Sequence, residues 1–547
     1  MKTLKPQTDY TAMTNGFQLV IPLDCEVNIA KNSPVRLLNA VMERMDYSKL
    51  YAAYSRLGRI EYSPKILLKI MVYGYMRKQI SSRALEACCR ENIHFMYLLE
   101  GQPAPDHNTI NRFRKNILTQ EAGRDILRQL VLLLHESSLL SFEAAFIDGT
   151  KIEANANQYS FVWKKATVKK EEKLLKKIYE ELPQRLKEVG IRFHVPEKIA
   201  ARQLKKLRKR IRERINTSGI EFVSGKGKRK TPLQRLSEQV DQWLAKIKQY
   251  TNDIHICGNR NSYSKTDHDA TFMHMKEDHM KNGQLKPGYN VNVATCSEFI
   301  IGSYISSDRN DVHTLIPFMN QLRRTYEGKP IGNIVVDSGY ESEENYCWFE
   351  DHPETALYVK PSNHEARKHK KYRTDISRRE NMIYDPEANT YTCAAGKLLR
   401  ETREKKTHTA SGLETTISIY ECSACSGCPL KEKCIRACGS KKPLEERHKV
   451  LHLSKRFIEQ REAMEAKISS PKGCLLRVNR SIQAEGNFAY IKHDLDFRRF
   501  LLRGNVKVAA EWLLFSLALN ILKIHHKIQN KRLGSGLVVP KQFPAGL

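Results

Sequence analysis

Two apolar runs of the chain, AAFID and NIVVD, each end in an aspartate, Asp148 and Asp337. Both runs have the composition of buried β-strands. Between them stand two further strand-like segments, GYNVNVAT and FIIGSYIS, and then a helical pattern, DVHTLIPFMNQLRRTY, for which Asp311 is the expected N-cap. This β-β-helix-β order predicts a parallel strand after the helical crossover. Because open α/β sheets bind ligands at the carboxyl ends of their strands, the order predicts an α/β fold with acids at such a site.

Each of these aspartates also has a local structural alternative. We expect the first strand to end in a turn at Gly149 and Thr150, and Asp148 could cap this turn through the following N–H groups. Asp337 could cap the helix predicted in ESEENYCWFEDH, although Ser342 is the better placed N-cap. The segment TALYVKPS predicts a further strand after this helix.

A third candidate acid lies near the C-terminus. The segment that begins NRSIQAEGNFAYIK predicts two helices with Gly504 between them. Glu485, Phe488 and Lys492 are three and seven residues apart, so an α-helix places them on one face. A solvated helix acid is the ordinary alternative. Three carboxylates from separate elements could hold Mg²⁺, and two such ions about 3.5–4 Å apart would activate an attacking oxygen and stabilise a leaving one at phosphorus.

The charge of the chain indicates a polyanionic partner. Lys and Arg number 92 against 61 Asp and Glu, a formal net charge of +31 in 547 residues. Nucleic acid fits better than a membrane surface, because the positive charges are spread along the chain and interleaved with acids. The most apolar segment, VAAEWLLFSLALNILKI, contains Glu511 and Asn520 and is shorter than the roughly 20 residues of a spanning helix, so we expect a core helix. No export signal is visible at the N-terminus, and we expect the chain in the cytoplasm.

Residues 35–135 have the apolar periodicity of helices. Within PAPDHNTINRFRKNIL, either Asp106 or Asn108 can cap a helix that carries Arg112 and Arg114. This helix could dock on DNA, or it could be an ordinary helix with solvated arginines.

Two segments interrupt the α/β pattern. Residues 164–250 predict charged amphipathic helices, broken by Pro183 and by the run SGKGKRK. Their charge could follow a phosphate backbone, although solvated helix faces are the commoner explanation. Residues 361–475 predict basic loops around a cluster of cysteines.

The cysteine cluster predicts a structural metal site. In ECSACSGCPLKEKC, Cys422, Cys425, Cys428 and Cys434 are spaced by three, three and six residues. Thiolates so close in sequence suit tetrahedral zinc. An iron–sulfur cluster uses similar spacings, but no redox chemistry accompanies it in this chain. Two further cysteines are candidate ligands: Cys393 and Cys438.

Over most of its length the chain resembles bacterial insertion-sequence transposases of the DDE type. The resemblance rests on ordered motifs: SPKILLKIMVYGYMRKQISSRALE, PDHNTINRFR, FIDGTKIEANAN, SKTDHDATFM, GYNVNVAT, VVDSGYES, IQAEGNFAYIK and FRRFLLRG. It implies an RNase-H-like core in which Asp148, Asp337 and Glu485 are the catalytic acids and Lys492 is the basic residue after the third acid. It also implies two ions of Mg²⁺ or Mn²⁺, double-stranded DNA from the element ends and the target, and a homodimer or larger complex.

The chain departs from the family at one place. Some relatives carry a tyrosine and an arginine seven and four residues before the glutamate, where this chain has Val478 and Ser481. Arg480 is offset by one residue, which turns it about 100° around an α-helix and argues against its contact with a phosphate. Trp163 could stack on a flipped base, although packing is the commoner role of a Trp beside a strand. The full set of candidate DNA contacts is Arg112, Arg114, Trp163, Arg480, Arg498 and Arg499.

These predictions combine into one architecture and one function. We expect an α/β protein whose RNase-H-like mixed sheet is flanked by helices, with an all-helical N-terminal domain, a charged helical insertion and a zinc-binding insertion. The expected order is a DNA-binding or assembly domain at 1–135, catalytic segments at 136–163, 261–360 and 476–530, insertions at 164–260 and 361–475, and a tail at 531–547. The expected function is that of a DDE transposase, which binds terminal inverted repeats and catalyses strand cleavage and strand transfer. The alternatives are a metal-dependent nuclease without joining activity and a zinc-stabilised, non-catalytic DNA-binding regulator.

Overall fold

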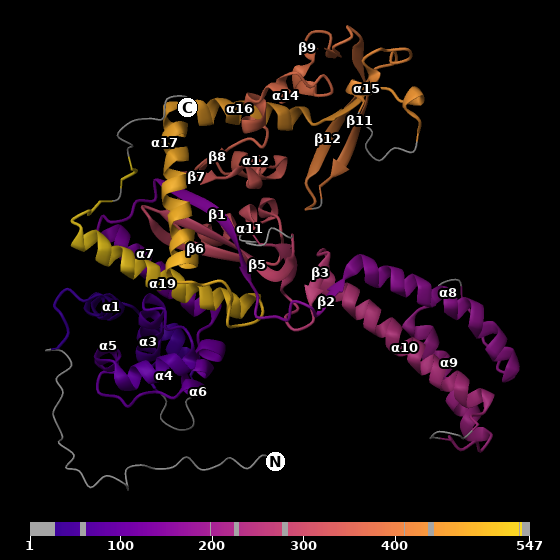
Figure 1. Ribbon diagram of the computed structural model, residues 1–547, viewed down its shortest axis with the longest axis horizontal. Helices are drawn as coiled ribbons and strands as arrows, with labels where there is room; N and C mark the ends of the chain where they lie inside the picture. Colours follow the sequence, from indigo (N-terminus) through magenta and orange to yellow (C-terminus); the bar gives the residue numbers. More distant parts are fainter. Residues whose placement is uncertain are drawn as a thin grey trace.

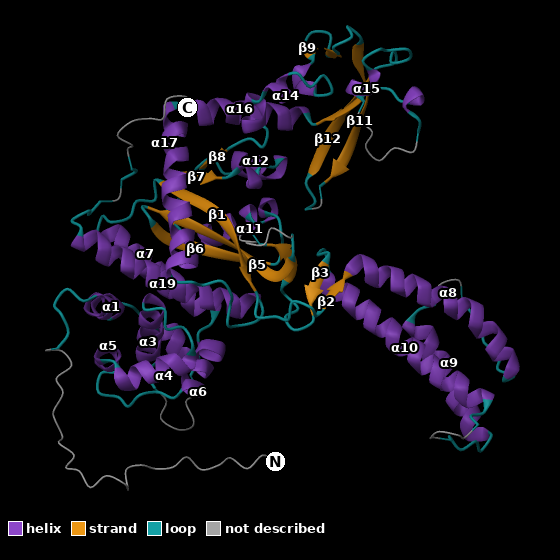
Figure 2. Ribbon diagram, viewed as in Figure 1, coloured by secondary structure: helices purple, strands orange, loops and turns teal. Residues whose placement is uncertain are grey.

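The computed structural model describes residues 28–54, 62–196, 199–223, 229–275, 283–409, 411–435, 442–534 and 536–538, with the side chain of Glu485 left out. At its centre is a mixed sheet (Figure 2). The strand order is β4 (Thr271–His274), β5 (Leu285–Cys296), β1 (Ala144–Glu153), β7 (Asn333–Val336) and β8 (Ala356–Val359), and β6 (Phe299–Ser306) also pairs with β5. Strands β1, β7 and β8 are parallel, whereas β5 is antiparallel to β1, β4 and β6. The predicted mixed α/β sheet and its parallel strand after the crossover are confirmed.

Strand β1 is longer than the sequence predicts. It continues through Gly149 and Thr150 to Glu153, because β5 pairs with it as far as the register Glu153↔Gly288. On its other side, β1 pairs with β7 over residues 144–147. The predicted turn at Gly149 is therefore wrong. Asp148 lies inside β1, at the first position beyond its pairing with β7.

The crossover helix α11 (Leu315–Thr325) connects β6 to β7, and α12 (Glu343–Glu350) connects β7 to β8. The N-cap position of α11 is Thr314, and Asp311 lies before it in a 3₁₀ turn, Asp311–His313. The prediction that Asp311 caps this helix is wrong, because its carboxylate points to the sheet instead, as described below. Ser342 caps α12 as predicted, since its hydroxyl accepts a hydrogen bond from the Asn345 N–H at 3.1 Å.

The N-terminal region is helical as predicted. Asp106 caps α6, because its carboxylate accepts a hydrogen bond from the Thr109 N–H at 2.7 Å, and the chain continues from α6 into a π-helical turn, Phe113–Ile117. The helices are α1 (Pro34–Met42), α2 (Ser48–Ala52), α3 (Pro64–Met76), α4 (Ser82–Glu91), α5 (Ile93–Leu98), α6 (His107–Arg112) and α7 (Gln120–Glu136).

Helix α19 (Asn505–Gln529) joins the N-terminal helices to the sheet. It packs against α3, α7 and β6, and one continuous hydrophobic cluster contains residues of all four elements (Figure 1). Within the part of the chain that the structure describes, α19 is the helix long and apolar enough to cross a membrane, but 83% of its most apolar window is buried inside the protein. The prediction of a core helix is confirmed, although the helix has 25 residues and is longer than expected.

The first insertion is a separate bundle of α8 (Lys164–Glu188), α9 (Ala201–Thr217) and α10 (Pro232–Cys257), and Figure 1 shows it projecting from the sheet beyond β2 (Phe161–Trp163) and β3 (Ser262–Ser264). These two strands pair with each other at its base. The prediction that Pro183 breaks a helix is wrong, because α8 continues through it and buries Leu182 and Leu186 against the other helices. Most of the run SGKGKRK, residues 224–228, lies outside the described residues.

The second insertion contains more regular structure than the predicted loops. It forms a five-stranded antiparallel sheet, because its short strands enclose a small hydrophobic core around Leu399 and Tyr420. The strands are β9 (Ile383–Asp385), β10 (Thr390–Thr392), β11 (Leu398–His408), β12 (Glu414–Glu421) and β13 (Val450–Leu453), accompanied by short helices α13 (His364–Lys368), α14 (Lys370–Arg373) and α15 (Lys431–Cys434).

The chain then returns to the central sheet. Helices α16 (Lys455–Ser469) and α17 (Pro471–Arg480) follow the insertion, and α17 packs beside β1 and β7 (Figure 1). After α17 come a π-helical turn (Ser481–Glu485), α18 (Gly486–Ala489) and a second π-helical turn (Tyr490–Asp494). Since π-helical turns are rare and often occur at functional sites, this segment is a candidate for function.

Candidate active site at the ends of three parallel strands

Three charged residues lie at one level, where β7 and β8 end beside the continuing strand β1. The register aligns Ile147 of β1 with Val336 of β7, and Val336 with Val359 of β8. In each strand the next residue is charged: Asp148, Asp337 and Lys360. Because adjacent strands are about 4.8 Å apart, these residues are neighbours across the sheet. The structure thus brings the two predicted aspartates together and adds a lysine that the sequence analysis missed, since a lysine after a strand carries no signal of its own.

Asp148 faces a basic side chain from the C-terminal helices. Its Oδ2 lies 3.8 Å from Nη1 of Arg480, and its Oδ1 accepts a hydrogen bond from the N–H of Gly149 at 2.8 Å. Both charged side chains are largely buried, with 13% of Asp148 and 21% of Arg480 exposed. A basic group therefore lies beside the first predicted acid.

Arg480 lies beside Asp148, although its sequence offset predicts that an unbroken α-helix turns it away. The helix is not unbroken, because a π-helical turn begins at Ser481, directly after Arg480. A π-helical turn closes i→i+5 hydrogen bonds and holds an additional residue relative to an α-helical turn. The offset of one residue therefore does not turn Arg480 away from the acids.

Asp337 directly follows β7 and stabilises its own turn. Its carboxylate accepts a hydrogen bond from the N–H of Gly339, so it caps the 3₁₀ turn Ser338–Tyr340 rather than α12. The alternative that Asp337 caps α12 is therefore wrong, because Ser342 caps α12 and Asp337 caps the turn before it. This cap uses Oδ1, and the same carboxylate remains half-buried at the strand end beside Asp148.

A further acid, Asp311, lies at the same place. Its Oδ1 accepts a hydrogen bond from Nδ2 of Asn290 on β5 at 2.6 Å. A Cβ atom added at Gly149 would lie 2.7 Å from this Oδ1 and 3.1 Å from the hydroxyl of Tyr340, which places both groups against β1 next to Asp148. Because Asp311 was predicted to be a helix N-cap, its position next to Asp148 was not predicted.

Tyr340 is a buried phenol among these carboxylates. Burial raises its pKa well above the usual value, and the charges of Asp311, Asp148 and Asp337 raise it further. Its hydroxyl donates a hydrogen bond to Oδ1 of Asn292 at 2.5 Å. Tyr340 therefore remains a neutral hydrogen-bond donor beneath the acids.

The third predicted acid is placed through its backbone. The π-helical turn that ends at Glu485 packs against β1 and β5, but the side chain of Glu485 lies outside the described residues. Lys492 is buried in the second π-helical turn. The continuous α-helix predicted for this segment is interrupted by two π-helical turns, Ser481–Glu485 and Tyr490–Asp494, and the shared face of Glu485 and Lys492 stays a prediction. Whether the three acids converge stays a prediction.

The predicted DNA contacts in the helical and inserted regions occupy different environments. Arg112 is exposed and lines a cavity of about 910 Å³. Arg114 is buried, donates a hydrogen bond to the carbonyl oxygen of Ile80 at 2.7 Å, and lies over the ring of Tyr75. This burial contradicts a DNA contact by Arg114, because its guanidinium lies inside the protein and is hydrogen-bonded to the loop between α3 and α4.

Trp163 and the two arginines after the π-helical segment make internal contacts. The ring of Trp163 packs against Phe272 with centroids 6.2 Å apart, which agrees with its packing role. Arg499 donates hydrogen bonds to the carbonyl oxygens of Ala154 and Ala156, at 3.2 and 3.1 Å, and so holds the chain after β1. Arg498 is exposed and forms an ion pair with Asp496 at 2.9 Å.

The four predicted zinc ligands gather around one small pocket, together with Cys393. Burial raises the pKa of the Cys422 thiol to about 11, and the neighbouring Cys425 and Cys393 contribute to this shift. Cys438 lies outside the described residues. Among the residues that the structure describes, however, no group of three or more His, Cys, Asp or Glu side chains is arranged to hold a metal ion. The structure therefore does not support the predicted zinc site.

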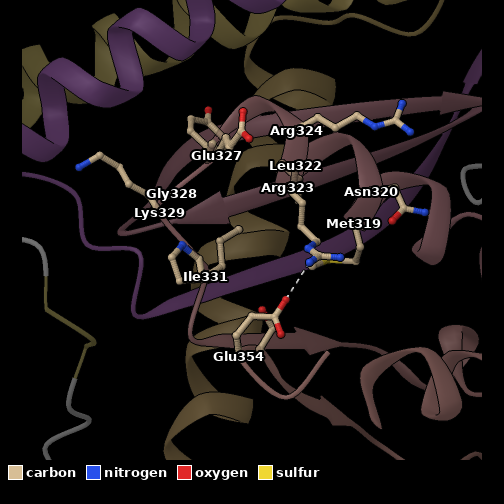
Figure 3. A pocket seen from close by; sticks show the side chains of 13 residues that line it. Met319, Asn320, Leu322, Arg323, Arg324, Glu327, Gly328, Lys329, Ile331 and Glu354 are labelled. Carbon is tan, nitrogen blue, oxygen red and sulfur yellow. Dashed lines mark ion pairs between the residues drawn. The ribbon is translucent and has the colours of Figure 1, made fainter. Parts of the chain in front are cut away.

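Another pocket, of about 450 Å³, lies at the opposite end of the sheet from the acids (Figure 3). It is formed before β7 begins, by the end of α11 and the following loop, and Arg323 forms an ion pair with Glu354 at its edge. None of the predicted site residues lines it. It therefore lies away from the candidate active site.

Two segments of the chain match known protein families. Residues 392–525 match the family described as transposase DDE domain, and residues 23–116 match the family described as transposase domain (DUF772). The first segment contains Glu485, Lys492 and Arg480, and the second contains Arg112 and Arg114. Asp148 and Asp337 lie in the part of the chain between the two matches. No curated protein and no solved structure matches the chain.

Proposed function

Because the chain belongs to the DDE transposases of insertion sequences, we propose that it binds the terminal inverted repeats of its own element, cleaves a strand at each end and joins the freed 3′-hydroxyl to target DNA. The observation that carries this proposal is the alignment of Asp148 and Asp337 at one level of neighbouring parallel strands, with Arg480 beside the first. A pair of acids with an adjacent cation suits phosphoryl transfer on a polyanion.

The strand order supports an RNase-H-like core. Strands β6, β5, β1, β7 and β8 are neighbours in this order, and β5 is antiparallel to the strands on either side of it. The core that the resemblance implies has its first acid in the first strand and its second acid in the strand after the first helix. Asp148 in β1 and Asp337 after β7 agree with these places.

The acids have the chemistry of ligands for a hard divalent cation, because Mg²⁺ and Mn²⁺ take carboxylate oxygens, although the described residues contain no group of three or more such side chains arranged to hold an ion. In the proposal Asp148, Asp337 and Glu485 hold two such ions. When bound, the ions supply an activated attacking oxygen and charge stabilisation at the leaving oxygen.

The remaining side chains bind and orient the DNA backbone. Arg480 neutralises a phosphate beside Asp148, and Lys492 steadies a phosphate near the cleaved bond. Tyr340 stays protonated and keeps Asn292 in place, so the floor of the site gains no further negative charge. Cleavage and joining use the same residues with different nucleophiles, since a water attacks in the first step and the freed 3′-hydroxyl in the second.

The proposal includes the partners and the location of the protein. The net charge of +31 suits double-stranded DNA at the element ends and at the target. Pairing two ends requires a homodimer or a larger complex, and we expect it to assemble in the cytoplasm.

Replacement of the second acid tests the proposed chemistry. The variant Asp337→Asn should lose divalent-ion-dependent cleavage of DNA that ends in the terminal repeat, while it binds this DNA as the wild type does. Cleavage that persists in Asp337→Asn would refute the assignment. Supplying pre-cut ends and target DNA then separates a transposase, which gives joined product, from a nuclease, which does not.

A structural zinc ion is a separate proposal. What supports it is the gathering of the thiols of Cys422, Cys425, Cys428 and Cys434 at one pocket with Cys393, and the arrangement of the described side chains counts against it. Elemental analysis of the purified protein tests it, because a resident zinc ion gives one equivalent per chain, and the variant Cys425→Ser lowers this value.

A further inference from the structure

A second feature of the strand ends is a pocket of about 300 Å³ on the far side of Asp337 from Asp148. Its floor comes from the strand ends, with Asp337 and Ser338 after β7 and Lys360 after β8. One wall comes from α17 and the turn after it, through Arg477, Arg480 and Ser481. The pocket thus adjoins the candidate active site and shares three of its residues, Asp337, Lys360 and Arg480.

The charged residues of this pocket favour an anion. Arg477 and Arg480 are three residues apart on α17, so they lie on one face of the helix. Together with Lys360 they give three basic side chains against one acid, Asp337. Because the three basic side chains are half-buried, their attraction for an anion is screened less than that of fully exposed charges.

Lys360 already binds a carboxylate in the free protein. Its ammonium forms an ion pair with Glu365 on α13, and this hydrogen bond and charge hold the pKa of Glu365 at about 2. Glu365 is 55% exposed and does not line the pocket, so its side chain approaches Lys360 from outside. Lys360 therefore has an exchangeable anionic partner, whose place a phosphate oxygen can take.

The register fixes how far this pocket lies from the acids. Lys360 is two strands away from Asp148, or about 10 Å at the usual strand spacing. This separation leaves room for two neighbouring phosphates of one strand, one between Asp148 and Asp337 and a second at Lys360 and Arg477.

We propose that this pocket binds a phosphodiester that neighbours the scissile one on the same DNA strand, and that Lys360 and Arg477 are the residues that hold it. The inference rests on the proposed function, because it takes the strand cleaved at Asp148 and Asp337 as the ligand. In this role the pocket sets the position of the DNA strand, so that the scissile phosphate lies at Asp148 and Asp337.

A scan with neutral phosphates tests the assignment. The probe is a linear duplex that ends in the terminal repeat, with a single methylphosphonate placed at successive positions near the cleavage site. For the wild type, one position beside the scissile phosphate should lower both binding and cleavage by about tenfold or more, since a charge-assisted hydrogen bond is lost. For Lys360→Ala that position should have no further effect, and the log–log salt slope of binding should fall by about one.

Two variants serve as controls. Lys329→Ala removes an exposed lysine at the opposite end of the same sheet (Figure 3) and should keep the wild-type methylphosphonate profile. Glu365→Gln removes the competing carboxylate and should bind the unmodified duplex more tightly, with the same sensitive position. It also keeps the test decisive if Lys360→Ala does not fold.

The outcomes separate this inference from the proposed function. Identical profiles for the wild type and Lys360→Ala, or a Glu365→Gln variant without a sensitive position, would overturn the pocket assignment even if cleavage occurs. If the wild type binds but does not cleave, the proposed function fails, whereas the binding profile still decides whether a phosphate occupies the pocket.

Discussion

Glu511 gives a prediction whose size follows from the structure. Its carboxylate is completely buried in α19 and accepts hydrogen bonds from the N–H groups of Leu501 and Leu502, at 3.1 and 3.0 Å. Burial raises its pKa from 4.5 to about 7, although these hydrogen bonds partly oppose the shift. The loop that Glu511 holds also accepts a hydrogen bond from Asn155, just after β1, through the carbonyl oxygen of Leu501 at 2.6 Å. The protonation of Glu511 is thus linked to the surroundings of the site.

The sign of the pH effect follows from the raised pKa. Between pH 4.5, the pKa of Glu511 in the unfolded chain, and about pH 7, the folded protein binds a proton at Glu511 that the unfolded chain does not. The stability that this proton contributes is complete below the unfolded pKa and is lost as pH rises through about 7. The difference from 4.5 to about 7 corresponds to about 3 kcal/mol. The variant Glu511→Gln should therefore match the wild type near pH 4 and exceed its free energy of unfolding by about 3 kcal/mol at pH 8.

Urea unfolding followed by tryptophan fluorescence, at several pH values, measures this difference. Glu298 supplies a control of opposite sign, because burial raises its pKa but the charges of Lys527 and Lys523 outweigh this and lower it. Glu298→Gln should lose stability at neutral pH, and the loss should shrink as pH falls. A stability difference for Glu511→Gln that stays constant from pH 4 to pH 8 would refute the reasoning.

Three further predictions concern the site and the N-terminal helices. Gly149→Ala places a Cβ 2.7 Å from the Asp311 carboxylate, so cleavage should fall while the circular dichroism spectrum is unchanged; full activity would show that the acids tolerate displacement. Arg114→Ala should lower the free energy of unfolding by about 2 kcal/mol, because its buried hydrogen bond to Ile80 is lost, whereas Arg112→Ala should weaken DNA binding in a mobility-shift assay and leave stability nearly unchanged. Lys69→Met removes the buried ammonium that Glu43 and Glu100 share, so it should lower the free energy of unfolding by about 2 kcal/mol. The loss should be smaller at high salt, because both glutamates are partly exposed. An unchanged melting temperature would contradict this.

Much of the fold follows from local sequence patterns. The strand order around GYNVNVAT and FIIGSYIS, the Ser342 and Asp106 caps and the buried helix α19 all agree with the structure. Each of these depends on neighbours close in sequence, such as an apolar period or a side chain that reaches an N–H group two or three residues away. Such signals can be read without knowledge of the rest of the chain.

The errors occur where a distant partner decides the local structure. Gly149 and Thr150 form a strand rather than a turn because β5 pairs with them, and α8 continues through Pro183 because the neighbouring helices bury its apolar face. The sequence predicts an exposed Arg114, but this side chain is buried and donates a hydrogen bond to the carbonyl oxygen of Ile80, 34 residues earlier in the chain. In each case tertiary contacts outweigh the local preference of one or two residues.

The sequence by itself determined which residue types are available for phosphoryl transfer: aspartates after apolar runs, a glutamate near the C-terminus, and an excess of basic side chains. The tertiary structure alone decided which of them are neighbours. The parallel register places Lys360 level with Asp148 and Asp337, and the packing of α17 brings Arg480 to Asp148. The physical reason is that strand pairing and helix packing join residues separated by up to several hundred positions, and no local pattern records the register of that pairing.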